Sequence, residues 1–166
     1  MEYSIYLVPS FAIIGLFAMA FKAKWVINQS AGGKNMQDLA SHIKEGALAF
    51  LSAEYRVLII FVVIAGALLA MVSSFIESTS SLIIVAFVIG AIFSALAGNI
   101  GMRIATEANV RTTEAARTSL PNALEVSFSG GMVMGLGVAG LAVFGLSVIF
   151  IILFQIFMGG EWGIDG

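Results

Sequence analysis

The chain has no cysteine and very few charged residues. With no cysteine among its 166 residues, a disulfide, a thiolate metal site and a cysteine nucleophile are all excluded. Charged residues make up 11% of the chain, and Asp38 and Asp165 are its only aspartates. Apolar residues make up 60%, and the mean hydropathy is +1.03. A soluble domain of this size could not hide so much apolar surface, so the composition predicts an integral membrane protein.

Four long stretches contain no Lys, Arg, Asp, Glu or His. They are residues 4–21, 57–76, 78–102 and 126–160. A helix needs roughly 20 apolar residues to cross about 30 Å of hydrocarbon. The sequence therefore predicts an all-α, polytopic transmembrane bundle of four spans, at about residues 3–21, 57–76, 82–102 and 126–158. No ionisable residue lies deep in any span, whereas ion pathways through membranes usually use such groups.

The basic residues predict how the spans are oriented. All eight Lys and Arg residues fall within residues 22–56 and 103–117. Because basic loops stay on the cytoplasmic side, we expect cytoplasmic loops at about 22–56 and 103–125 and both termini on the opposite side. In the first span the positive charge follows the apolar run and Glu2 precedes it. This order favours an uncleaved anchor over a signal peptide.

Helical periodicity continues beyond the spans. Apolar residues recur every three or four positions over residues 36–51, which predicts an amphipathic helix that runs into the second span. Residues 28–33 have the composition of a turn. The fourth helix is expected to begin near residue 120, where Pro121 fits the first turn. From there to Met158 it is about 58 Å long, so it must project into water, tilt strongly or break at its glycines.

Small residues recur along the last two spans. The third span carries Ala86, Gly90, Ser94 and Gly98 at four-residue spacing. The fourth span carries Gly131, Gly135, Gly137, Gly140 and Gly145. Because packing drives helix association in lipid, these positions predict faces against which other helices pack closely.

Charges alternate in sign between the third and fourth spans. The row consists of Arg103, Glu107, Arg111, Glu114 and Arg117. Spacings of three and four place these side chains along one helical face. One interpretation is an arginine row that binds an anion such as phosphate. The favoured interpretation is a solvated face of ion pairs, each contributing only about 0.3–0.5 kcal/mol, because every Arg has a Glu at pairing distance.

Other polar residues give weaker signals. His42 and Glu45 are three residues apart, as two metal ligands could be, but the chain has no second such pair, so a solvated helix face is favoured. Asn99 could line a pathway, although a hydrogen bond across a helix interface is the commoner use. Gly130 and Gly131 lack the residues of a phosphate-binding loop.

Three segments together resemble the membrane-bound, ion-translocating inorganic pyrophosphatases. The third-helix signature of that family is matched by Gly98-Asn-Ile-Gly-Met-Arg-Ile-Ala-Thr106, Ala108-Asn-Val-Arg-Thr-Thr113 and Ala115-Ala-Arg117. The start of its second helix is matched by Ile43-Lys-Glu-Gly-Ala-Leu-Ala-Phe-Leu51 with Glu54-Tyr55, and the start of its fourth by Phe128-Ser-Gly-Gly-Met-Val-Met-Gly135. The resemblance covers about residues 3–158.

The resemblance implies an activity for a longer protein. Members of the family hydrolyse Mg²⁺-pyrophosphate on the cytoplasmic side and pump protons, sodium ions or both outward, as homodimers. Their aspartate-rich motifs belong to helices after the fourth. The implied partners are pyrophosphate, the remaining helices of the pump, a second copy and the lipid bilayer, with no nucleic acid. The implied location is a bacterial or archaeal inner membrane.

The two aspartates set a limit on site assignment. Holding Mg²⁺ and orienting water needs several carboxylates together, and Asp38 and Asp165 are predicted on opposite sides of the membrane. We therefore expect an amino-terminal, outer-ring part of a pump whose Mg²⁺ ligands lie beyond residue 166. No residue of this chain is predicted to be catalytic, substrate-binding or metal-binding. The alternative is a self-contained four-helix accessory subunit that assembles through its glycine-rich faces.

Overall fold

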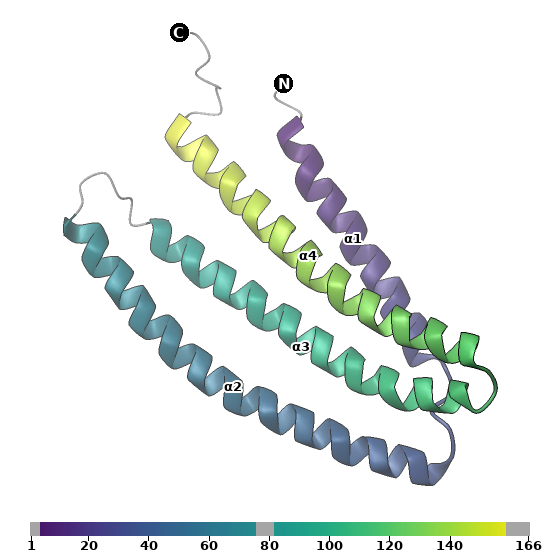
Figure 1. The fold of residues 1–166 in the computed structure, drawn as a ribbon. Coiled ribbons are helices and arrows are strands. Elements are labelled where there is room, and N and C mark those ends of the chain that lie inside the picture. The colour runs from purple at the N-terminus through teal and green to yellow at the C-terminus, as the bar shows by residue number, and fades with distance from the viewer. Residues whose placement is uncertain (1–3, 76–81, 159–166) are drawn as a thin grey trace.

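The chain forms four long helices. The structure, a computed structural model, describes residues 4–75 and 82–158. The helices are α1 (Ser4–Ile27), α2 (Lys34–Phe75), α3 (Leu82–Ala116) and α4 (Leu120–Met158) (Figure 1). All four are long and apolar enough to cross a membrane. The prediction of an all-α protein with four membrane-spanning helices is confirmed, and the chain is a multi-pass membrane protein.

Each helix extends beyond the apolar span predicted for it, at the end of the span nearer the hydrophilic end of the bundle. The helix α2 begins at Lys34, so the amphipathic segment and the second span form one helix. The helix α3 continues past its span to Ala116, and α1 continues past residue 21 to Ile27. The helix α4 begins at Leu120 and does not break at its glycines. The alternative in which α4 breaks at its glycines is therefore wrong, and projection into water or a strong tilt is left to accommodate its length.

The helices lie side by side in the order α2, α3, α4 and α1 (Figure 1). The helix α4 packs against both α3 and α1, whereas α2 contacts only α3 among the described residues. The buried residues of α3 recur at spacings of four, three, four and three; they are Ala97, Gly101, Ile104, Ala108 and Arg111. Val26 of α1 and Val133 of α4 are fully buried. The core therefore lies where α1, α3 and α4 meet.

Only some of the small residues make close helix contacts. A Cβ atom added to Gly130 would lie 2.7 Å from the Cβ atom of Ala108 on α3, and one added to Gly140 would lie 2.7 Å from Leu16 on α1. By contrast, a Cβ atom at Gly90, Gly98, Gly131 or Gly135 would meet no described atom within 4 Å. The predicted packing role is thus confirmed for part of α4 and at Gly101 of α3, where an added Cβ atom would lie 2.9 Å from Met134 of α4. Gly90 and Gly98 of α3 face open space instead.

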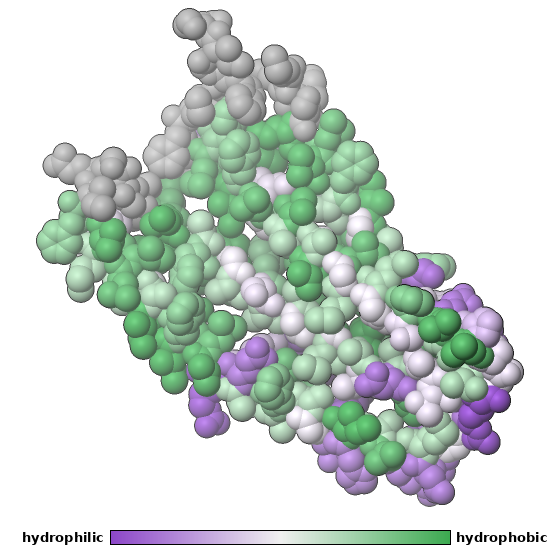
Figure 2. Space-filling view, in the orientation of Figure 1, coloured by the Kyte–Doolittle hydropathy of each residue, from purple (hydrophilic) through white to green (hydrophobic). Residues whose placement is uncertain are grey.

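Hydrophilic residues gather at one end of the bundle. Figure 2 shows them around the end that holds residues 28–33 and the turn between α3 and α4. The first described residue of α1 and the last of α4 lie at the other end (Figure 1). This separation matches the distribution of the basic residues along the sequence. Asp165 and the residues from 76 to 81 lie outside the described ranges.

Candidate functional site

Two cations from different helices meet one carboxylate near the hydrophilic end. The carboxylate is Glu107 of α3, whose Oε1 atom lies 2.7 Å from Nζ of Lys44 on α2. Its other oxygen, Oε2, lies 2.5 Å from Nη1 of Arg111, one turn further along α3. We call these three residues the Lys44–Glu107–Arg111 cluster. Each carboxylate oxygen accepts from one cation, so the cluster joins α2 to α3.

Arg111 also joins α3 to the end of α1. Its side chain is only 10% exposed. The Nε and Nη2 atoms donate to the backbone oxygen of Ile27 at 3.1 and 2.9 Å. Ile27 is the last residue of α1, where carbonyl groups lack partners within the helix and the helix dipole favours positive charge. Arg111 therefore caps α1 and, through Glu107, connects three helices.

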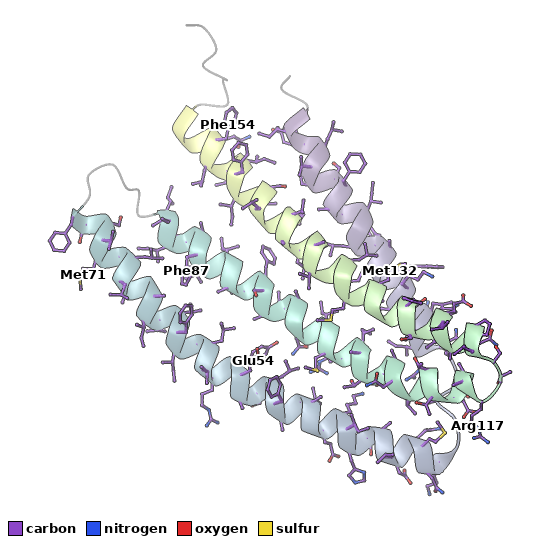
Figure 3. All side chains as sticks on the ribbon, in the orientation of Figure 1. Glu54, Met71, Phe87, Arg117, Met132 and Phe154 are labelled. Carbon is purple, nitrogen blue, oxygen red and sulfur yellow. The ribbon has the colours of Figure 1, made fainter. Side chains whose placement is uncertain are left out.

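The other two arginines of the alternating row make only local contacts. Arg103 donates from Nε to Oδ1 of Asn99 at 2.8 Å, and not to Glu107. Arg117 lies at the end of α3 near the turn to α4 (Figure 3). Its side chain is 69% exposed, and its Nη1 atom is 3.4 Å from Oε2 of Glu114. The interpretation as a solvated row of ion pairs therefore holds at Arg117 and is wrong at Arg111. Asn99 bonds within its own helix, so the expected bond across an interface is not the one observed.

The second candidate, His42 with Glu45, lies on an exposed part of α2. Nδ1 of His42 is 2.8 Å from the backbone oxygen of Asp38, one turn earlier in the same helix. Among the described residues, no three His, Asp or Glu side chains come together as a metal site would require. The favoured interpretation of this pair as a helix surface fits its exposure.

A hollow of about 220 Å³ lies beside the cluster. Its lining includes Gln37 and Ser41 of α2, Thr106 of α3, and all three members of the cluster. The charges of the cluster sum to +1, and both carboxylate oxygens are already in contact with cations. These groups are suited to holding helices in register, since no activated nucleophile or ligand set is among them.

The contact with Lys44 was not anticipated from the sequence. Lys44 and Glu107 are 63 residues apart, so no local spacing connects them. One signal was present. The face of α2 directed at α3 includes Ala40, Ala47 and the buried Leu51, and Lys44 is the charged member of that series. A cation among small and apolar residues on one helical face indicates a partner carboxylate on the neighbouring helix.

The cluster lowers the pKa of Glu107 below its ordinary value of 4.5. The hydrogen bond from Lys44 contributes most, partial burial opposes it, and Arg111 lowers the pKa further. Because the folded-state pKa is the lower one, the ionised Glu107 stabilises the fold at any pH above about 4.5. This contribution is lost as the pH falls through the folded-state pKa.

The variant Glu107→Gln tests this pH dependence. At neutral pH we expect it to lower the free energy of unfolding by about 1 kcal/mol, a modest value because Lys44 is partly exposed. Below about pH 4.5 the difference between variant and parent should shrink, because the unfolded parent takes up a proton at Glu107, and it should be lost as the pH falls through the folded-state pKa. Thermal unfolding in detergent, followed by circular dichroism from pH 7 downward, measures this. Parallel curves at every pH would contradict the prediction.

The chain is similar to known proteins over most of its length. The profile of the family described as inorganic H+ pyrophosphatase matches residues 13–161. The K(+)-insensitive pyrophosphate-energized proton pump of Methanosarcina mazei is 40% identical over 152 residues, which cover 92% of this chain and 22% of that pump. The K(+)-stimulated pyrophosphate-energized sodium pump of Thermotoga maritima is 36% identical over 162 residues, which cover 95% of this chain and 21% of that pump.

The matches extend over all four helices but over only a part of each relative. The chain spans about a fifth of the length of these pumps. The family resemblance inferred from the segments around Ile43, Gly98 and Phe128 is confirmed. With a match over most of its residues and four helices able to span a membrane, the chain belongs to the inorganic H+ pyrophosphatase family.

Proposed function

We propose that this chain forms the amino-terminal, four-helix part of a membrane pump that couples hydrolysis of Mg²⁺-pyrophosphate to transport of protons, sodium ions or both. One observation carries the proposal. The similarity to a pyrophosphate-energized pump extends over 162 residues, and therefore through all four helices, while covering 21% of that pump. A similarity of this extent is expected of a part of such a pump.

In this proposal the four helices are a scaffold and not the catalytic centre. The described residues bring no three His, Asp or Glu side chains together, so they do not fit a Mg²⁺ site of the kind that hydrolysis needs. Holding Mg²⁺ and activating water is assigned to helices outside this chain. The contribution of this chain is to hold α1, α2 and α3 together through the Lys44–Glu107–Arg111 cluster.

The orientation of the helices is also part of the proposal. The basic residues would face the cytoplasm, and α1 would begin on the other side, in accord with the hydrophilic residues that gather at one end of the bundle (Figure 2). The cluster would then lie at the face on which pyrophosphate is bound and split. The complete pump would act as a homodimer in a bacterial or archaeal membrane, as the family resemblance implies.

A chimeric pump tests the proposed function. The matching fifth of the Thermotoga maritima pump is replaced by this chain, and phosphate release from pyrophosphate with Mg²⁺ is measured in membranes. We expect the chimera to release phosphate, whereas the recipient without this fifth and the isolated chain should release none. A self-contained accessory subunit would predict an inactive chimera. Phosphate release by the isolated chain would contradict the assignment of catalysis to other helices.

A further inference from the structure

One side of the seam between α3 and α4 is covered by α1, and the other side is open. On α4, Gly140 lies against Leu16 of α1. Ala142, only two residues further, lines a groove of about 530 Å³ between α3 and α4. Two residues correspond to about 200° around a helix of 3.6 residues per turn, so α1 and the groove are on opposite sides of α4.

The open side of the seam carries glycines that no described residue uses. Gly90 and Gly98 line the groove from α3. Gly131 and Gly135 precede groove residues Val138 and Ala142 by seven positions, which places them on the same side of α4. A Cβ atom at any of these four glycines would meet no described atom within 4 Å.

Lipid does not account for this arrangement of small residues. On α2 most exposed positions within the apolar span are bulky, such as Phe61 and Ile64 at 60% and 56% exposed, and the small exposed ones are Ala67, Ala70 and Ser74. Small residues in membrane helices lie mainly where another helix approaches closely, as Gly140 does against α1. The groove therefore has the character of an interface between helices.

The same side of the bundle stays apolar beyond the membrane-spanning residues. Leu39, Ile43 and Phe50 of α2 are 64%, 49% and 59% exposed. The first two line a second hollow, of about 140 Å³, together with Asn109 of α3. Asn109 follows Gly98 by eleven residues, about three helical turns, so both hollows open on one side of α3. In the proposed orientation the charged residues at positions 34–56 lie outside the hydrocarbon, and this second hollow lies there with them.

The two hollows together define the occupant. Lipid could cover only the groove, and a soluble partner could cover only the hollow beside Leu39. A long helix that runs from the membrane into water, as α2, α3 and α4 do, could cover both. The related pumps are more than four times as long as this chain and so contain further segments. We infer that this side of the bundle is the docking surface for a long helix from the rest of the pump, an inference that rests on the proposed function.

A split pump tests the docking surface. The tagged chain is co-expressed with the Thermotoga maritima pump from which the matching fifth has been removed, and co-purification in detergent is measured. We expect the two pieces to co-purify. Gly98→Leu should reduce the recovered partner about tenfold, equivalent to about 1.4 kcal/mol, because leucine would fill the groove. The control is Gly66→Leu on α2. A Cβ atom at Gly66 also meets nothing within 4 Å, but Gly66 lines neither of the two hollows.

The outcomes separate docking from function and from folding. Both variants alone should keep the helical circular dichroism and unfolding temperature of the parent chain, because both positions face open space. Equal recovery with Gly98→Leu and Gly66→Leu, or no co-purification of the unsubstituted pieces, would overturn the inference. So would a dimer of the isolated chain that Gly98→Leu disrupts, because the occupant would then be a second copy. Co-purification without phosphate release would leave the docking surface standing and count against the proposed function.

Discussion

Replacing Arg111 by alanine is expected to lower the free energy of unfolding by about 3 kcal/mol, the lower end of the cost of removing one partner from a buried ion pair, because Glu107 is 26% exposed. The side chain is 10% exposed and donates to both Glu107 and the backbone oxygen of Ile27. Without it, Glu107 keeps only the exposed Lys44, and the carbonyl group at the end of α1 loses both donors. The structure thus predicts that α1 detaches from α3 at this end first.

A matched substitution is available in the same helical row. Arg117→Ala removes the same side chain from a position that is 69% exposed and 3.4 Å from its partner. We expect it to change the free energy of unfolding by less than about 0.5 kcal/mol. Urea or thermal unfolding of both variants in the same detergent gives the comparison. Similar losses for the two variants would show that the contacts of Arg111 are not what stabilises the chain.

The same substitution distinguishes bracing from anion binding in the chimeric pump. If Arg111 braces the helices, Arg111→Ala lowers the thermal stability of the pump, and the remaining folded protein keeps the affinity of the parent for pyrophosphate. If Arg111 binds an anion directly, affinity falls while thermal stability stays at the parent level. Its donors already meet three acceptor atoms, Oε2 and the backbone oxygen of Glu107 and the backbone oxygen of Ile27, so we expect the first result.

The helices themselves could be predicted from the sequence because each signal was local. Uncharged stretches gave the four spans, and apolar residues at three- and four-residue spacing showed that the helix before residue 57 continues into the second span. The start of α4 followed from Pro121, which needs no backbone donor in the first turn of a helix. These features depend on neighbours within a few residues.

The contacts that build the cluster could not be predicted in the same way. The bond from Arg111 to Ile27 joins residues 84 apart, and the spacing along α3 suggested only Glu107 and Glu114 as partners. Arg103 has a glutamate four residues away yet donates to Asn99. Which of several equally spaced partners a side chain takes depends on the neighbouring helix. That neighbour is fixed by packing and not by local spacing.

Glycines show the same limit, because spacing alone does not distinguish a glycine in contact from one that faces open space. Gly130 and Gly131 are adjacent in α4. A Cβ atom at Gly130 would lie 2.7 Å from the Cβ atom of Ala108, whereas one at Gly131 would meet no described atom within 4 Å. The partner at Gly130 is fixed to the backbone of α3 and cannot rotate away, so only separation of the two helices can relieve the overlap.

The pair Gly130→Ala and Gly131→Ala therefore gives opposite expected results from the same chemical change. Alanine favours a helix over glycine by about 1 kcal/mol, so Gly131→Ala should leave stability unchanged or raise it slightly. Gly130→Ala gains the same helix propensity but forces α3 and α4 apart. We therefore expect a net loss of about 2 kcal/mol in the free energy of unfolding. Denaturant unfolding in one detergent compares them directly. Equal stability of the two variants would mean that α3 and α4 do not contact each other at Ala108. The packing of α3 against α4 described above would then be contradicted at this position.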